Sequence, residues 1–287
     1  MAYPSNSNTD INNELYSNLV TAAQFAAYEN SVARQMATIF DAPANSGKIL
    51  QVPVWSAISA ENISDEAAAT AKTTNTTSAT ITLSEHVVYH QITDMLRDSA
   101  QSDVLAQLGD QSGRAIAESM DTEFFSKFSS LSGSTGAIAL ASFTKDDIMD
   151  RVATLRAAKL TGPFFAVIHP TAANQMKKAL TGTSAYTANT NLGNNILSNY
   201  FVDMVAGCQV IESSLVPYSD PLSGGTGVAT CAVFSPSAIG HAMRGAVKLE
   251  QQRQASARAT DLVLTGVAGA GVLQAGHGVI MNIDLVA

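Results

Sequence analysis

The chain has 287 residues, enough for one large domain or two connected ones, and its formal net charge is −8. Because 24 acidic residues stand against 16 basic ones, the chain has no general electrostatic affinity for nucleic acid. Only 14% of its residues are charged, against about 25% in ordinary soluble proteins. Small and hydroxyl-bearing residues stand in their place, which favours a surface that faces other protein molecules, although a secreted polar protein is an alternative.

No targeting segment, membrane span or disulfide framework is predicted. The N-terminus (MAYPSNSNTDINNEL) lacks a basic region followed by an apolar run, so no signal peptide is expected. No apolar stretch approaches the roughly 18–20 residues that a membrane-spanning helix needs. Cys208 and Cys231 have neither a CxxC spacing nor a clustered histidine, so we expect two buried apolar side chains and no metal site.

The first predicted element is a helix that follows a polar lead. The apolar residues recur every three or four positions, at Leu15, Leu19, Ala22, Phe25 and Ala26. Residues 33–40 are expected to continue the helix, and residues 41–47 (DAPANSG) end it with turn-forming residues.

From residue 49 the apolar period is two, which predicts strands. Leu50, Val52 and Val54 share one side of the first strand, and Pro53 favours an edge position. A longer second strand has Ala79, Ile81, Leu83, Val87 and Tyr89 on one face, and the intervening residues 56–78 are polar. The pattern predicts a long two-stranded arm. Because an isolated hairpin buries too little apolar area to be stable alone, we expect a neighbouring subunit to hold it.

A very long helix is predicted next, over residues 102–131. Its apolar residues keep helical spacing: Val104, Leu105, Leu108, Ala115, Ile116, Met120, Phe124, Phe128 and Leu131. Gly109 and Gly113 should each cost about 1 kcal/mol relative to alanine, so the apolar stripe must compensate. The turn at residues 133–136 (GSTG) ends the helix.

The remaining chain is predicted to be mixed α/β. Thr144 is expected to cap a helix, with Asp146 and Asp147 in its first turn and a buried stripe of Ile148, Val152 and Leu155. Residues 160–163 end this helix, and a strand at 164–168, a helix from Pro170 to Leu180 and a loop at 181–195 are predicted to follow. Further strands are predicted at 209–211, 230–234 and 247–251. The Gly- and Val-rich tail over 262–286 has strand periodicity at Val279, Met281, Ile283 and Leu285.

Motifs for nucleotide or acyl chemistry are incomplete in this sequence. The run at 47–49 (GKI) lacks the glycine spacing and the Ser/Thr of a phosphate loop. The run at 269–271 (GAG) has Gln274 where a dinucleotide fingerprint needs glycine, and it opens a strand. There is no G-x-S-x-G elbow. We therefore predict no catalytic or cofactor-binding residue, no cofactor, and a protein that is not an enzyme.

The histidines and the acidic run are also predicted to be structural. His86 and His90 lie on a strand, about 13 Å apart, which is too far to share one metal ion. His169, His241 and His277 are scattered and are each expected to be a satisfied structural histidine. Glu61, Asp65 and Glu66 are expected to be solvated charges on the polar part of the arm.

Three passages carry a resemblance to a known family. The first runs from Gly47 to Leu96, with an acidic Ala/Thr-rich segment between strands ahead of the long helix. The second is 205–213 (VAGCQVIES), a strand after a small-residue turn, and the third runs from Ala257 through 269–272 to Val279. In this order they resemble, over nearly the whole chain, the major capsid proteins of tailed phages with the Hong Kong ninety-seven-type capsid fold.

The resemblance implies an α+β fold in five segments. These are an N-terminal arm (1–46), an extended hairpin loop (47–93), a peripheral domain with a long spine helix (94–159), a mixed α/β axial domain (160–257) and a return to the peripheral domain (258–287). Candidate inter-subunit contacts are Trp55, Glu61, Asp65, Glu66, Lys72 and Arg97.

The resemblance further implies a structural subunit of an icosahedral phage head, which self-assembles into pentamers and hexamers that enclose double-stranded DNA. Some relatives begin with a long scaffolding segment that a protease removes. No comparable segment is recognised in this sequence, so either a separate scaffolding protein exists or a segment was removed before Met1. The first is expected, with a portal and an optional decoration protein. The expected location is the virion, after assembly in the host cytoplasm and without a membrane. Lys48 and Lys72 lie on the arm, but crosslinking is not predicted.

Alternative functions remain open at this point. A nanocompartment shell of the encapsulin kind shares the fold but would need a cargo-peptide groove. A hydrolase would need a nucleophile and base that the sequence does not reveal, and a secreted binding module would need a signal peptide. DNA contact, if any, would involve Arg244, Lys248, Arg253 and Arg258, whose spacing scatters them over both faces of a strand-like region or leaves them to pair with acids of adjacent subunits.

Overall fold

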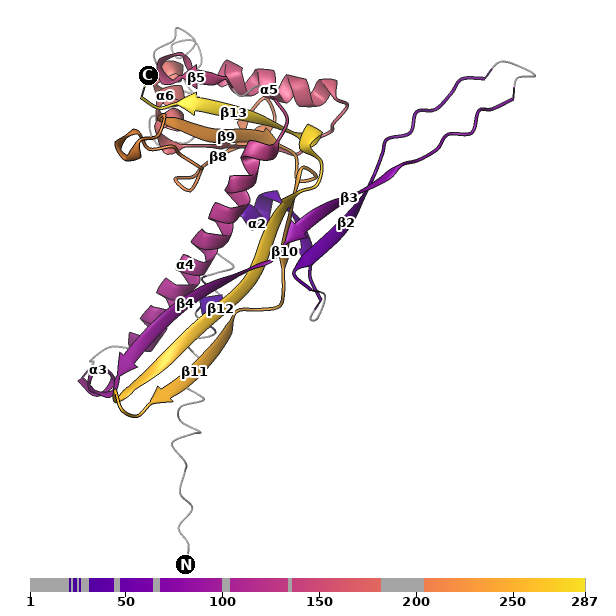
Figure 1. Cartoon of the computed structure of the whole chain (residues 1–287). Helices are drawn as coiled ribbons and strands as arrows, with labels where there is room; N and C mark the ends of the chain where they lie inside the picture. Colours follow the sequence, from indigo (N-terminus) through magenta and orange to yellow (C-terminus); the bar gives the residue numbers. More distant parts are fainter. Residues whose placement is uncertain are drawn as a thin grey trace, which may run out of the picture.

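A computed structural model describes residues 21, 23–24, 26, 31–43, 47–63, 68–99, 104–133, 136–181 and 204–286. In this part of the chain a six-stranded and a five-stranded sheet are connected by one long helix, and a two-stranded arm projects away from both sheets (Figure 1).

The helices and strands alternate irregularly along the chain, as expected for an α+β protein. The helices are α2 (Ala33–Met36), α3 (Asp94–Ser99), α4 (Val104–Ser126), α5 (Lys145–Ala157) and α6 (Pro170–Thr181), with 3-10 turns η1 (Lys127–Ser130), η2 (Leu140–Ser142), η3 (Pro221–Ser223) and η4 (Ala275–His277). The strands are β1 (Thr38–Asp41), β2 (Ile49–Trp55), β3 (Thr76–Thr82), β4 (Ser84–Thr93), β5 (Ala137–Ala139), β6 (Phe164–Ile168), β7 (Met204–Val205), β8 (Cys208–Glu212), β9 (Val228–Phe234), β10 (Ile239–Met243), β11 (Lys248–Gln254), β12 (Ala259–Val272) and β13 (Gly278–Asp284).

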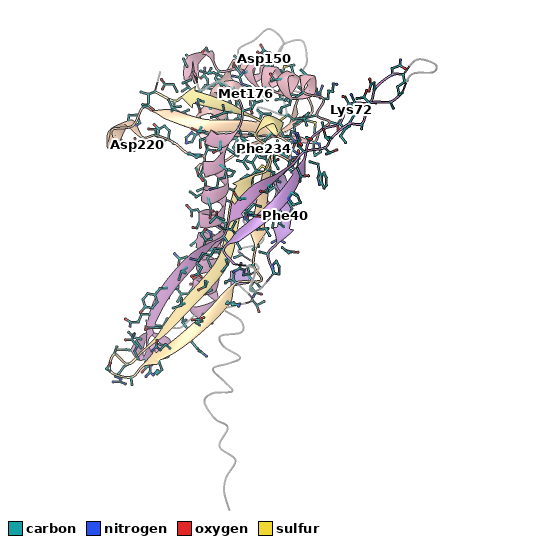
Figure 2. All side chains as sticks on the ribbon, turned by 45° about the vertical axis from the view of Figure 1, so that its right-hand side comes forward. Phe40, Lys72, Asp150, Met176, Asp220 and Phe234 are labelled. Atoms are coloured by element: carbon teal, nitrogen blue, oxygen red, sulfur yellow. The ribbon has the colours of Figure 1, made fainter. Side chains whose placement is uncertain are left out.

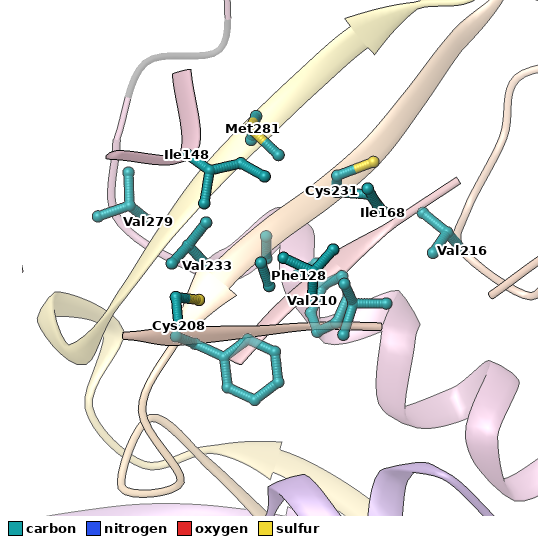
Figure 3. Close-up of a cluster of buried hydrophobic side chains, with 14 of the residues drawn as sticks. Phe128, Ile148, Ile168, Cys208, Val210, Val216, Cys231, Val233, Val279 and Met281 are labelled. Carbon is teal, nitrogen blue, oxygen red and sulfur yellow. The ribbon is translucent and has the colours of Figure 1, made fainter. Parts of the chain in front are cut away.

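The six-stranded sheet has the order β5-β13-β9-β6-β8-β7 and contains the larger core. The buried faces of α5 and α6 pack into this core, together with the phenylalanines at the end of α4. Figure 3 shows the two cysteine side chains among Ile148, Val233 and Met281. Burial raises the pKa of both thiols to about 12, so they remain neutral, and the prediction of buried cysteines is confirmed.

The five-stranded sheet is built around β12. This strand pairs with β4 on one side, and with β11 and then β10 on the other, while β1 adds to β10 in parallel. Helix α4 lies along one face, where Leu262 and Leu264 of β12 are fully buried near Ile116 and Met120. Period-two burial in β12 thus matches the apolar stripe of the helix.

Helix α4 and η1 confirm the predicted long helix over the described residues 104–130. The helix passes through Gly109 and Gly113 without a break. A Cβ on Gly113 would lie 2.3 Å from the carbonyl oxygen of Ala23, so this glycine allows the N-terminal segment to approach the helix closely. Ala115 was expected in the apolar stripe but is exposed.

The predicted elements from 144 to 181 are confirmed. Thr144 and Asp147 form a reciprocal capping box at the start of α5, and Ile148, Val152 and Leu155 are buried. Strand β6 and helix α6 follow, and residues 206–207 form the turn before β8. Most of the predicted loop at 181–195 lies outside the described residues.

Two predictions about the first hundred residues are wrong. Residues 33–40 do not form one helix: α2 ends at Met36, and Thr38–Asp41 forms strand β1 because it can pair with β10. The second strand of the arm is divided at Leu83: β3 pairs with β2, whereas β4 pairs with β12. Most of the predicted first helix lies outside the described residues.

Each of the two larger sheets combines strands from different predicted segments. The five segment boundaries remain a prediction. Strands β10 and β11, from segment 160–257, hydrogen-bond to β12 in the five-stranded sheet. Strand β13, from segment 258–287, pairs with β9 and β5 in the six-stranded sheet. The strand at 239–243 was not predicted.

Candidate assembly surface

The arm, residues 49–82, is a hairpin whose outer part leaves the ladder. Strands β2 and β3 pair from Ile49–Thr82 to Trp55–Thr76, and the Ser56 N–H then donates to the Asn75 carbonyl at 3.1 Å. Beyond this point the described residues form no strand and are almost all exposed. Lys72 lies far out on this arm, whereas Phe40 lies near its base (Figure 2).

The base of the arm rests on glycines of β12. A Cβ on Gly269 would lie 2.1 Å from the carbonyl oxygen of Thr82, and one on Gly271 would lie 2.6 Å from that of Thr80. No side chain fits there without moving backbone, so these two positions need glycine. Ile81 between them is fully buried. The arm is therefore fixed at its base and extended at its outer end.

The predicted contact residues fall into two places. Trp55 is 65% exposed at the end of β2. Farther out, Lys72 Nζ lies 3.5 Å from Glu61 Oε2, and both side chains are exposed. Asp65 and Glu66 lie outside the described residues. Arg97 lies on α3, which Figure 1 shows at the opposite end of β4 from the arm.

Sequence reasoning missed the apolar side chains of the arm. Ile49, Ile58 and Ile63 are 42–60% exposed, so the described arm presents isoleucines as well as Trp55 to its surroundings. An isoleucine in a segment otherwise made of small and polar residues was the available signal. Several exposed apolar side chains along one extended element are typical of a surface for protein contact.

A second exposed surface is the face of the five-stranded sheet opposite α4. Val87 and Tyr89 of β4 are 52% and 55% exposed there. Next to them Asp261 is 6% exposed and accepts a hydrogen bond from Gln91 Nε2 at 3.0 Å and another from Gln254. A hydrogen bond with Asp261 raises the pKa of Tyr89.

A serine, a histidine and a carboxylate meet between β4 and α4, although the sequence had revealed no such set. Ser119 Oγ lies 2.7 Å from His86 Nδ1, and His86 Nε2 lies 3.3 Å from Glu123 Oε2. Burial opposes the ionisation of Glu123, but hydrogen bonds with His86 and Ser84 outweigh it and lower the carboxyl pKa. Ser119 is in the middle of α4, where backbone N–H groups bond within the helix and cannot form an oxyanion hole. These contacts attach β4 to the helix.

The other histidines are structural, with one correction. His90 Nε2 lies 2.8 Å from Ser112 Oγ, and His277 Nδ1 lies 2.7 Å from Ser237 Oγ. His169 accepts a hydrogen bond from the N–H of Thr171. His241 was expected to be satisfied, but within the described structure neither of its ring nitrogens has a partner.

Two of the four candidate DNA contacts bond within the subunit. Arg253 donates to both carboxylate oxygens of Asp94, at 2.8 and 2.6 Å, and Arg244 donates to the Gly47 carbonyl. Pairing of these basic residues with acids of adjacent subunits stays a prediction. Among the described residues, no three His, Cys, Asp or Glu side chains form a metal-binding group, and no helix could span a membrane.

Comparison with known proteins identifies the family to which this chain belongs. A family model described as phage capsid protein matches residues 76–280. Similar solved structures include the capsid of cyanophage P-SCSP1u, with a TM-score of 0.67, 19% identity and 86% of each chain covered. A structure from Mycobacterium phage Che8 has a TM-score of 0.65 and 16% identity, with 83% of this chain and 85% of that chain covered. The capsid of a native GTA particle has a TM-score of 0.66 and 15% identity, with 87% of this chain and 89% of that chain covered. Among curated proteins, none matches the sequence.

The family match and the shared fold confirm the predicted resemblance to tailed-phage major capsid proteins and the α+β class. They do not favour the hydrolase, secreted-module or nanocompartment alternatives. The chain therefore belongs to the phage capsid protein family, as a structural subunit of the virion shell and not an enzyme.

Proposed function

We propose that this chain polymerises as pentamers and hexamers into an icosahedral shell around a double-stranded DNA genome, in the host cytoplasm. The observation that carries the proposal is the arm, which is anchored at its base and projects away from both sheets (Figure 1). The arm exposes Trp55, Ile58 and Ile63 and has no core of its own. It is therefore suited to pack on a second copy of this chain. A separate scaffolding protein, a portal and an optional decoration protein complete the proposed set of partners.

In this proposal the outer arm packs on a neighbouring subunit through Trp55, the isoleucines and the acidic run that contains Asp65 and Glu66. Arg97, at the other end of β4, would contribute to a different contact of the same subunit. Burying the apolar side chains supplies affinity, and the exposed Glu61–Lys72 pair adds orientation more than stability.

Deleting residues 59–77 should leave a folded subunit that cannot close shells. The deleted part contributes no side chain to the two larger cores, so the melting temperature should change little. Negative-stain imaging and size-exclusion chromatography would compare the particles. Intact shells of normal size from the deletion variant would contradict the proposal.

A point variant makes the same test without shortening the chain. Trp55→Ala removes an exposed side chain, so it should weaken assembly and leave the circular dichroism spectrum unchanged. Met149→Ala, which removes an exposed apolar side chain of α5, serves as the matched control. Particles filled with protein cargo and free of DNA would instead favour a nanocompartment shell.

We further propose that the axial domain covers approximately residues 160–257 and that its loops surround the capsomer axis. The loop predicted from the Thr/Asn-rich sequence at 181–195 supports this, because a loop of that length is costly unless it serves an interface. A cryo-EM map of the shell that places this connection far from any local symmetry axis would contradict it.

The shell is proposed to hold DNA by enclosure, without sequence recognition. The chain has 16 basic against 24 acidic residues, and Arg244 and Arg253 already bond within the subunit. Gel-shift titration of unassembled subunits should therefore give weak binding that falls steeply with salt. Tight or sequence-selective binding at physiological salt would overturn this prediction.

A further inference from the structure

His241 lies inside the five-stranded sheet. It is in the middle of β10, paired with Ile39 of β1 on one side and Ala270 of β12 on the other. The side chain is 2% exposed, and within the described structure neither ring nitrogen forms a hydrogen bond. A buried polar group without a partner is costly, so its position requires an explanation.

Three charged or titratable side chains interact electrostatically with this histidine, each from a different element. They are Arg34 of α2, Glu123 of α4 and His86 of β4, which we call the junction together with His241. Glu123 is the acid of this group, and its carboxylate already accepts from Ser84 Oγ at 2.6 Å and lies 3.3 Å from His86 Nε2. It also bonds with the backbone of Ala270.

A proton on His241 would therefore place a second positive charge beside Arg34 in a region closed to water. Burial, together with the smaller effects of Arg34 and His86, lowers the pKa of His241 to about 4, and Glu123 acts in the opposite direction. The closed junction accommodates the neutral ring and disfavours the charged one.

We propose that His241 is a pH-sensitive switch. Protonation of its ring in a mildly acidic medium opens the junction and changes the packing of α4 against β10 and β4. Opening lets water solvate the imidazolium ring, which the closed form cannot do. Because Phe124, the next residue after Glu123, packs into the core of the six-stranded sheet, movement at the junction would reorient one sheet relative to the other. The inference goes beyond the proposed shell function, because it concerns the shape of a single subunit.

The direction of the effect follows from the two pKa values. In the open form the ring would titrate near 6.5, and in the closed form near 4. Acidification from 6.5 towards 4 therefore favours the open form, by up to tenfold per pH unit, and above 6.5 there is no effect.

Amide hydrogen exchange on the full-length protein tests the proposal at pH 7.5 and pH 5.0. Exchange in peptides covering 119–124 and 239–243 is divided by the rate of the same unfolded peptides at each pH. The corrected opening should rise about 30-fold at the lower pH, since 1.5 pH units below 6.5 are effective. His241→Gln should abolish the rise, and His169→Gln, between β6 and α6, should retain it.

Arg34→Gln provides a second variant if His241→Gln does not fold. Removing the neighbouring positive charge raises the pKa of His241 in the closed form, so the response to acid should become smaller. Unchanged protection in the wild type, an equal rise in His241→Gln, or an undiminished response in Arg34→Gln would each overturn the proposal. The measurement follows opening within the subunit, so shell assembly does not decide its outcome.

Discussion

Phe124→Ala should lower the free energy of unfolding by about 3–5 kcal/mol. The ring is fully buried, and its centroid lies 5.8 Å from that of Phe125, 6.0 Å from that of Phe128 and 6.0 Å from that of Phe234. Truncation removes apolar burial and leaves a cavity at the place where α4 enters the six-stranded sheet. Urea unfolding of the assembly-incompetent arm deletion, with and without the substitution, would measure the loss.

The matched control for Phe124 is a neighbour on the same helix. Thr122 is exposed, so Thr122→Ala should change stability by no more than about 0.5 kcal/mol. A loss below about 1 kcal/mol for Phe124→Ala would contradict the packing described for the end of α4.

Asp121→Ala should lower the free energy of unfolding by about 2–4 kcal/mol, because it removes a buried carboxylate that caps another element. Its Oδ1 accepts from Ser31 Oγ at 2.7 Å, and its Oδ2 accepts from the Val32 N–H at 2.8 Å. Oδ1 also accepts from the N–H of Ala33, the first residue of α2. Without these bonds the segment before β1 should detach from α4, and limited proteolysis near residue 31 should accelerate.

Exposed Glu118→Ala on α4 is the control, and it should behave as the wild type. Burial raises the pKa of Asp121, so ionisation is more costly in the folded chain. The protonated form therefore adds stability that is present below the ordinary carboxyl pKa and is lost as pH rises through the folded pKa. Relative to Asp121→Asn, the wild type should become less stable over that window; a parallel pH profile for the two proteins would contradict this.

The sequence by itself determined the elements whose signal is local. The apolar stripe predicted α4, and Thr144 as N-cap with Asp146 and Asp147 in the first turn predicted the start of α5. Strands β2, β8, β9 and β13 were predicted within one or two residues of their observed ends, β2 and β13 from a period of two. Side-chain periodicity and capping depend on neighbours along the chain, so no tertiary information was needed.

For the candidate surface, the sequence placed Trp55, Glu61 and Lys72 on one arm because they lie in one polar hairpin. It could not show that Arg97 lies at the far end of β4, since that depends on where the strand leads. It also could not separate β3 from β4 at Leu83, because both halves have the same alternating pattern and differ only in their partners.

Only the tertiary structure decided which strand joins which sheet and what the unusual residues are for. Strand β1 forms because β10 offers an edge to residues that follow a helical pattern. Gly113, Gly269 and Gly271 are explained by backbone that crosses them, and His241 by the junction that encloses it. These contacts join segments far apart in the chain, so their energies come from packing and solvation in the folded state and leave no periodic signal in the sequence.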